Sequence, residues 1–173
     1  MSKQNARIFA LAVSGLLVAC SLVLGVLGKA YLTFGPIRLT FENLPVLLGG
    51  FFFGPLIGGV IGVCSDLLSC LVAANPINPI ITLGAFAVGL TAGLLKKKVF
   101  RSSALLSFLA SSLFAHIVGS MIIKSAGLRI YYLYPYSLIL LRIPLYLVIS
   151  TLEGYFIYVF SKIKAIQKIA ERM

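Results

Sequence analysis

Long apolar stretches separated by short polar segments make up most of this chain of 173 residues. A helix needs about 20 mostly apolar residues to cross the roughly 30 Å of hydrocarbon in a bilayer. The pattern therefore predicts an all-α integral membrane protein, a bundle of six transmembrane helices with a long first outer loop. The expected spans of this single domain are residues 8–28, 43–53, 55–74, 79–95, 104–125 and 137–161, followed by a basic tail over 162–173.

The second of these spans is unusually short. Gly54-Pro55 divides the apolar stretch that runs from Leu44 to Ala74, because proline cannot continue a helix interior. Residues 43–53 then supply only about 16 Å at 1.5 Å per residue. We expect this helix to recruit loop residues, or to lie tilted among neighbours that shield it from lipid.

Basic residues at the ends of the apolar stretches predict the orientation. The strongest run is Lys96-Lys97-Lys98 with Arg101, and further basic residues precede the first span and follow the last. Six spans place all three groups on one side of the membrane, and by the positive-inside rule that side is the cytoplasm. We therefore expect both termini to be cytoplasmic. Residues 29–42, 74–79 and 126–136 are the expected outer loops.

Composition supports this class and excludes others. The chain is 60% hydrophobic and only 11% charged, whereas soluble domains carry about 25% charged residues. The net charge of +11 could indicate nucleic acid binding, but the charges lie at the ends of apolar stretches, where membrane topology explains them. The sequence has no phosphate-binding loop motif and no Cys/His spacing typical of a metal site. We expect no enzyme activity, no cofactor and no metal.

Three charged residues lie inside apolar stretches, where a charge is costly and normally faces an interior, a cavity or a partner. Asp66 and Arg142 belong to the outer half of the bundle, and either both contact a ligand or they form an ion pair between two helices. Glu153 follows Arg142 by eleven residues, which returns to nearly the same helix face about 16 Å deeper. We expect Glu153 to be structural, and also His116 in the fifth span.

Other polar residues of the outer side are further candidates. Asn75 and Asn78 belong to an Asn-Pro-Ile-Asn-Pro segment that either caps the fourth helix or points an amide at a ligand. The outer basic residues would attract an anion by electrostatics, and they are Lys29, Arg38, Lys124 and Arg129. The tyrosines around residues 131–136 fit either an interfacial aromatic belt or a lid over a ligand.

Small residues four apart line several helix faces. Gly15 and Ala19 form such a pair in the first span, and Gly58 and Gly62 form another in the third. Small faces of this kind allow close approach of helices. They predict either packing within the bundle or docking of a partner membrane helix.

Four segments of the chain resemble a known family. They are Arg38–Pro45 (RLTFENLP), Phe52–Gly59 (FFGPLIGG), Asn78–Gly84 (NPIITLG) and Arg142–Pro144 (RIP). The chain resembles the substrate-binding (S) components of energy-coupling factor (ECF) vitamin transporters over nearly its whole length. The third and fourth segments resemble the folate-specific branch in particular.

The resemblance implies six helices and an outer pocket closed by the first outer loop. It also implies a complex with one membrane scaffold (T) subunit and two cytoplasmic ATPases, in the cell membrane of a prokaryote. The expected substrate-binding residues are Arg142, Asp66, Asn78, Asn75 and Arg38. The expected docking residues are Gly15, Ala19, Gly58 and Gly62, of which the first two match the position of the family's Ala-x-x-x-Ala motif.

Folate carries two carboxylates, which suits the outer basic residues, whereas a cationic vitamin such as thiamine would need acids and an aromatic cage. The alternatives are an S component for riboflavin, pantothenate or thiamine. A small membrane enzyme and a membrane assembly subunit are alternatives of a different class.

Overall fold

A computed structural model describes residues 3–34, 37–102 and 105–163, almost all of which are helical. In chain order the elements are α1 (Lys3–Tyr31), β1 (Thr33–Phe34), β2 (Ile37–Arg38), α2 (Asn43–Phe53), α3 (Pro55–Val72), α4 (Pro79–Ser102), α5 (Leu105–His116), the π-helix η1 (Ile117–Ile123), α6 (Lys124–Tyr132) and α7 (Tyr136–Ser161). Within the described ranges, five helical stretches are long and apolar enough to cross a membrane, and α2 is a shorter apolar helix. The predicted all-helical membrane bundle is confirmed at this level.

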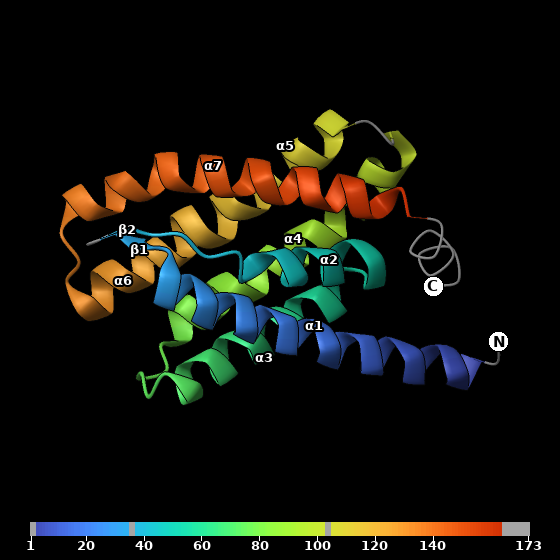
Figure 1. The fold of residues 1–173 in the computed structure, drawn as a ribbon, viewed down its shortest axis with the longest axis horizontal. Helices are drawn as coiled ribbons and strands as arrows, with labels where there is room; N and C mark the ends of the chain where they lie inside the picture. The colour runs from blue at the N-terminus through green and yellow to red at the C-terminus, as the bar shows by residue number, and fades with distance from the viewer. Residues whose placement is uncertain (1–2, 35–36, 103–104, 164–173) are drawn as a thin grey trace.

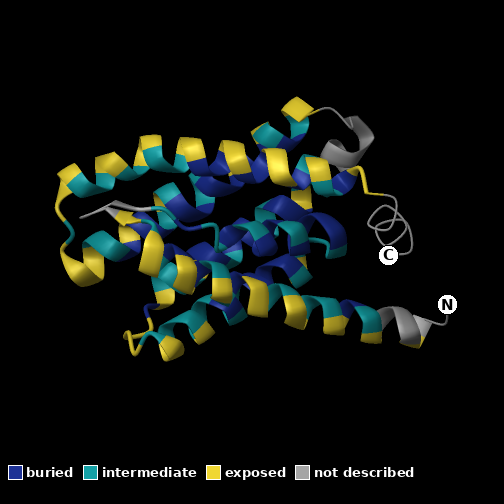
Figure 2. Cartoon of the chain, viewed as in Figure 1, coloured by how far each residue is buried: buried dark blue, intermediate teal, exposed yellow. Residues whose placement is uncertain are grey.

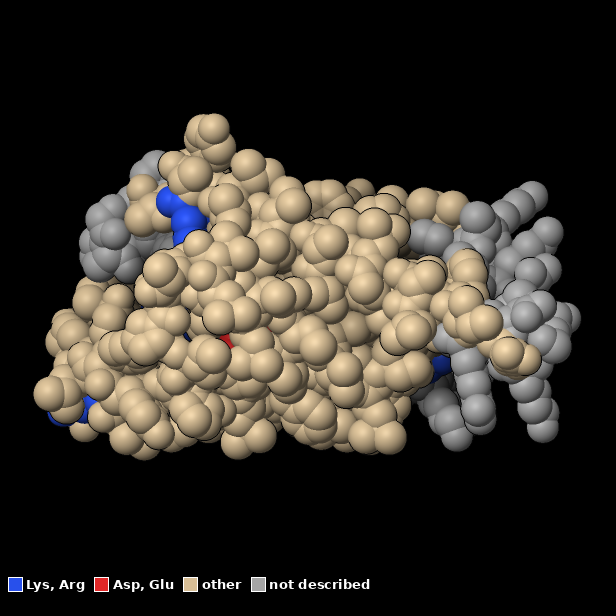
Figure 3. Space-filling model, turned by 90° about the horizontal axis from the view of Figure 1, so that it is seen from below, with Lys and Arg blue, Asp and Glu red and all other residues tan. Residues whose placement is uncertain are grey.

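The chain passes back and forth along the long axis of the bundle (Figure 1). The start of α1 and the end of α7 lie at one end, together with the end of α4 and the start of α5. The β1–β2 hairpin, the α3–α4 connection and the α6–α7 turn lie at the other end, which we call the hairpin end. On the face in Figure 3, Lys and Arg atoms lie toward the two ends, and the surface between them is nearly all uncharged.

Helix α2 occupies the centre of the bundle. Most of its eleven residues are buried, and Leu47 and Phe51 are not exposed at all. The helix packs against α1, α3, α4 and α7, and Phe51 meets Phe108 of α5. Gly54 ends the helix with a φ of 95°, a conformation that glycine adopts without strain, and Pro55 then opens α3. The expectation that neighbours shield this short helix is confirmed, because the surrounding protein replaces the lipid contacts that a longer span would make.

Two expected outer loops are shorter than the sequence indicated. Residues 126–136 were expected to form a loop, but α5, η1 and α6 form one continuous helical stretch from Leu105 to Tyr132. It ends where Leu133 adopts a left-handed conformation with a φ of 50°. In the first outer loop, α1 continues to Tyr31, and an antiparallel hairpin pairs Thr33 with Arg38.

One of the two small-residue faces is buried in the structure, and the other is exposed. Gly58 and Gly62 are buried, and a side chain at either position would collide with backbone of α2 or α4. Their expected docking role is therefore wrong, and internal packing, the alternative, describes them. Gly15 and Ala19 are exposed on α1, which shows a mostly uncovered side along its length (Figure 2). Nothing in the chain lies within 4 Å of a side chain built at Gly15.

Candidate functional site

A pocket of about 380 Å³ opens near the hairpin end. Its wall combines residues of α1, α3, α4, α6 and α7 with the segments before α2 and α4. The charged residues that line it are Lys29, Glu42, Asp66, Lys124 and Arg142. Four of the five predicted substrate-binding residues line this pocket, namely Asp66, Asn75, Asn78 and Arg142. The fifth, Arg38, lies on β2, and its side chain is outside the described part of the structure.

Asp66 lies on α3 and is held from the neighbouring helix α4. Its Oδ2 accepts a hydrogen bond of 2.6 Å from the hydroxyl of Thr82. Asp66 and Arg142 both line the pocket, but they do not form an ion pair with each other. The alternative of a structural Asp66–Arg142 bridge is therefore wrong. The carboxylate therefore keeps acceptor capacity for a ligand that offers N–H groups.

Arg142 lies on α7 and contacts two groups of the wall. One terminal nitrogen donates to the backbone carbonyl of Ser120 at 3.4 Å and to the hydroxyl of Tyr146 at 3.3 Å. The guanidinium also stacks over the Tyr146 ring, 5.1 Å from its centre. Its Nε is buried without a hydrogen-bond partner. These contacts are long, so the cation has capacity left for an anionic ligand.

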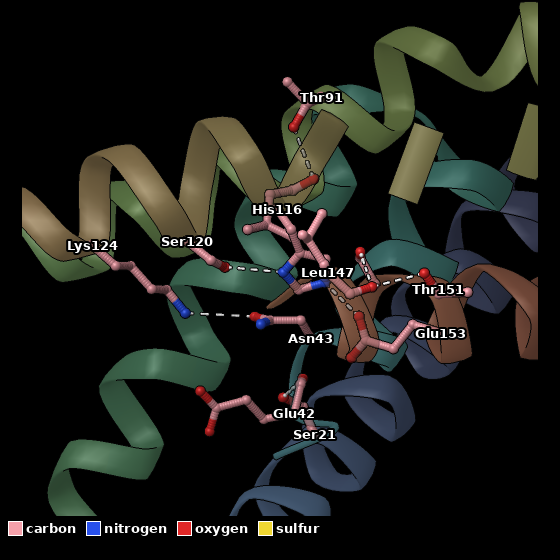
Figure 4. A network of polar contacts seen from close by, with 12 residues as sticks. Ser21, Glu42, Asn43, Thr91, His116, Ser120, Lys124, Leu147, Thr151 and Glu153 are labelled. Carbon is pink, nitrogen blue, oxygen red and sulfur yellow. Dashed lines mark hydrogen bonds and ion pairs between the residues drawn. The ribbon is translucent and has the colours of Figure 1, made fainter. Parts of the chain in front are cut away.

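Lys124 is the residue that the sequence placed least well. It was expected at the edge of an outer loop, but it is only 7% exposed and faces the pocket from the start of α6. Its Nζ reaches the side-chain oxygen of Asn43 at 3.5 Å, as Figure 4 shows. Glu42 and Asp66 line a small cavity together with Lys124, so this buried cation lies near both carboxylates of the pocket wall. Its charge adds to the attraction of the pocket for an anion.

Asn78 acts as the cap of α4. Its side-chain oxygen accepts hydrogen bonds from the backbone N–H groups of Ile80, at 3.0 Å, and Ile81, at 3.3 Å. Its amide nitrogen donates to the carbonyl of Gly127 at 3.5 Å and so links α4 to α6. The capping interpretation of the Asn-Pro segment is confirmed for Asn78, whereas Asn75 is exposed at the rim of the pocket.

The tyrosines divide between the pocket and its surroundings. Tyr132, Tyr134 and Tyr146 line the pocket, and the Tyr132 hydroxyl donates to the carbonyl of Pro76 across the rim at 3.4 Å. Tyr136 instead lies under the guanidinium of Arg129, 4.4 Å from the ring centre. The pocket thus has aromatic surfaces that can pack against a flat ligand.

The electrostatics of the site favour an anion. Three cations and two carboxylates line the pocket, which gives an excess of one positive charge (3 − 2 = 1). In the part of the chain that the structure describes, no three His, Cys, Asp or Glu side chains gather so that they could hold a metal ion.

His116 and Glu153 lie in the protein interior, as the sequence predicted. His116 Nε2 and a carboxylate oxygen of Glu153 are 2.5 Å apart, and neither side chain is exposed. The sequence indicated that each was structural, but not that the two form a pair.

A comparison with models of protein families shows the family of this chain. The family model described as "ECF transporter, substrate-specific component" matches residues 9–169. A curated relative is the uncharacterized protein MG098 homolog of Mycoplasma pneumoniae (strain ATCC 29342 / M129 / Subtype 1), which is 34% identical over 116 residues. That alignment covers 67% of this chain and only 24% of the relative.

Two solved structures share the fold at low sequence identity. FolT bound with folic acid superposes with a TM-score of 0.66 and 19% identity, over 94% of this chain and 93% of FolT. The S component for biotin from an ECF-type ABC transporter gives 0.68 and 15%, over 94% and 95% of the two chains. The family match over residues 9–169 shows that this chain belongs to the substrate-specific components of ECF transporters, which are transporter subunits and not enzymes.

Proposed function

We propose that the protein is the folate-binding S component of an ATP-driven ECF importer. It binds the vitamin from the outer side of a prokaryotic cell membrane, with both termini in the cytoplasm. Delivery then requires a membrane scaffold subunit and two ATPase subunits. The observation that carries this proposal is the pocket that sets Asp66 against the cations Lys124 and Arg142.

Folate matches this arrangement at both of its ends. Its pterin ring offers amino and ring N–H groups, which suit the carboxylate of Asp66, and its glutamate tail offers two carboxylates to Lys124 and Arg142. The tyrosines give the rings between them a surface to pack on. The pocket volume of 380 Å³ falls within the range of about 300–1,000 Å³ that is usual for sites of small molecules.

Biotin is the second candidate, because a biotin S component shares this fold as closely as FolT does. Biotin has a single carboxylate and no aromatic ring, so it would leave more of the cationic and tyrosine surface unused. Riboflavin and pantothenate are further candidates. Thiamine is a cation and would meet a pocket with excess positive charge.

The first experiment is a titration of the purified chain in detergent with folate, biotin, riboflavin and thiamine. Isothermal titration calorimetry is suitable, because the chain has no tryptophan whose fluorescence a ligand could quench. We expect tight binding of folate alone. A preference for another vitamin would overturn the assignment of folate as the substrate and would not affect the assignment of the family.

Two variants test the site. We expect Arg142→Ala and Asp66→Asn each to weaken folate binding about 10–100-fold, since a hydrogen bond to a charged group contributes about 1.5–3 kcal/mol. Lys162→Ala is the control, because it removes an exposed cation that follows α7, outside the pocket. If both site variants bind folate as tightly as the parent, the assignment of this pocket is wrong.

A further inference from the structure

A buried ionisable pair links the end of α5 to α7. His116 ends α5, Glu153 lies on α7, and neither side chain is exposed at all. His116 Nε2 faces a carboxylate oxygen of Glu153 at 2.5 Å. Such a pair inside a membrane bundle is costly to bury, and packed apolar residues of similar size often stabilise a fold equally well. Its presence therefore calls for a role beyond holding two helices together.

His116 contacts both residues that hold Arg142, through other atoms than those that Arg142 binds. Its Nδ1 lies 3.1 Å from the hydroxyl of Ser120, and its ring lies 5.4 Å from the ring of Tyr146. The carbonyl of Ser120 and the hydroxyl of Tyr146 are the two hydrogen-bond acceptors of Arg142. Figure 4 shows Ser120 and Glu153 on opposite sides of the His116 ring. The imidazole thus contacts the side chains of Ser120 and Tyr146, the two residues that bind the Arg142 guanidinium.

The backbone at Ser120 allows this residue to contact both His116 and Arg142. Ser120 lies in the π-helix η1, a rare form that interrupts α-helices and is frequent at functional sites. Besides the guanidinium of Arg142, its carbonyl accepts a bond from the hydroxyl of Ser125 at 3.3 Å. One residue therefore presents its side chain to His116 and its carbonyl to the pocket wall.

Glu153 fixes the orientation of the imidazole. A ring nitrogen engaged by a carboxylate determines which way the other nitrogen points, and here Nδ1 points at Ser120. Without the carboxylate the ring could turn about its χ2 angle. Ser120 and Tyr146, which hold Arg142, would then lose their contacts with His116. The bonds of Arg142 to these two residues are long, 3.3 and 3.4 Å, so its orientation depends on how well the two residues are held.

We propose that His116 and Glu153 are positioning residues that hold Ser120 and Tyr146 in place and so orient the Arg142 guanidinium toward the ligand. Neither residue touches the ligand in this proposal. It rests on the proposed function above, because it requires Arg142 to contact the bound vitamin.

The test is a double-mutant cycle on folate affinity. His116→Phe with Glu153→Leu replaces the pair by apolar side chains of similar size and leaves no buried charge unpaired. We expect this replacement to weaken folate binding about tenfold, the lower end of the effect of second-layer partners at other sites. In an Arg142→Ala background the same replacement should change the affinity less than about twofold, since uncoupled sites are additive and coupled ones are not.

Three further variants keep the outcome interpretable. Ser112→Ala is the matched control, because Ser112 is equally buried on α5 but its hydroxyl has no partner, and its affinity should equal that of the parent. Glu153→Gln, which keeps an oxygen to accept the His116 N–H, should recover most of the affinity that Glu153→Leu loses. If the paired replacement does not fold, Ser120→Ala removes only the hydroxyl that meets His116, and its loss must also depend on Arg142.

The outcomes separate the two proposals. Affinity equal to the parent after replacement of the pair, or an equal loss with and without Arg142, overturns the positioning role and leaves the folate site standing. If Arg142→Ala itself binds folate like the parent, the site fails, and the positioning inference fails with it.

Discussion

Lys124 is the most deeply buried cation among the described residues of the pocket wall. It is buried at 7% exposure, and its ammonium has one long bond to an amide oxygen of Asn43. A bound carboxylate would accept a further hydrogen bond from this ammonium at close range, where the low dielectric strengthens the attraction. This residue should therefore contribute to affinity as strongly as Arg142.

We predict that Lys124→Met weakens folate binding at least tenfold, because a charge-assisted bond contributes about 1.5–3 kcal/mol. Methionine keeps a flexible chain of similar length and removes the charge. The measurement is calorimetry in detergent, with Lys162→Met as the control for the change of net charge. Equal affinity of the two variants would show that Lys124 does not contact the anion.

Single residues were predictable from the sequence where depth decided their role. Asp66 and Arg142 were found because each is a charge inside an apolar stretch of the outer half, and both line the pocket. Lys124 was named only as an outer basic residue that would attract an anion, and not as a buried residue of the site. It follows an apolar run and resembles a residue at a membrane boundary, whereas α6 continues the helix and buries it. The His116–Glu153 pair was missed because the sequence gives no register between α5 and α7.

Among the helices, α4 shows how a capping residue can be mistaken for a ligand contact. Asn78 uses its side-chain oxygen on two N–H groups of α4 and its nitrogen on the carbonyl of Gly127. Both ends of the amide are thus engaged within the protein.

We predict that Asn78→Ala lowers the free energy of unfolding by about 1 kcal/mol, the usual effect of losing an N-cap. Asn78→Ser, which keeps a capping oxygen, should retain most of that stability and bind folate like the parent. Unfolding by SDS in mixed micelles and calorimetry give the two readings. Reduced folate affinity in the serine variant at parental stability would instead identify the amide as a ligand contact.

The boundaries of the helices could be predicted from the sequence where a proline or a glycine interrupts an apolar stretch. The break at Gly54-Pro55 and the start of α4 at Pro79 lie where they were expected. The end of α6 did not, because the polar and aromatic residues near Arg129 resemble a loop, yet the helix continues to Tyr132. Faces of small residues could not be assigned either, since Gly15 and Gly58 have the same spacing pattern but opposite exposure.

Helix α1 lies at the periphery of the molecule. Large apolar side chains such as Leu11 and Leu16 are well exposed on this helix, on either side of the small residue Gly15. In a membrane, association of helices depends on close van der Waals packing, and small residues permit it. We propose that the face with Gly15 and Ala19 receives the scaffold subunit.

We predict that Gly15→Leu with Ala19→Leu abolishes co-purification with the scaffold subunit while folate binding by the isolated chain is unchanged. The two leucines would hold a partner helix away from the backbone of α1. Ala110→Leu, a change at an exposed position of α5, is the control and should leave assembly intact. Assembly of the leucine variant at the parental level would exclude this face as the docking surface.

The π-helical turn has a consequence for the phase of the helical stretch from Leu105 to Tyr132. His116 and Lys124 are eight residues apart, and an uninterrupted α-helix would set them about 80° apart around its axis. The wider turn over Ile117–Ile123 takes up part of that angle, so that one side chain meets Glu153 while the other reaches the pocket. Each residue of an α-helix advances by about 100°, so a change of one residue between His116 and Lys124 that the turn does not absorb would rotate one side chain relative to the other by that angle. Chain length between these two residues is therefore as strictly constrained as their identity.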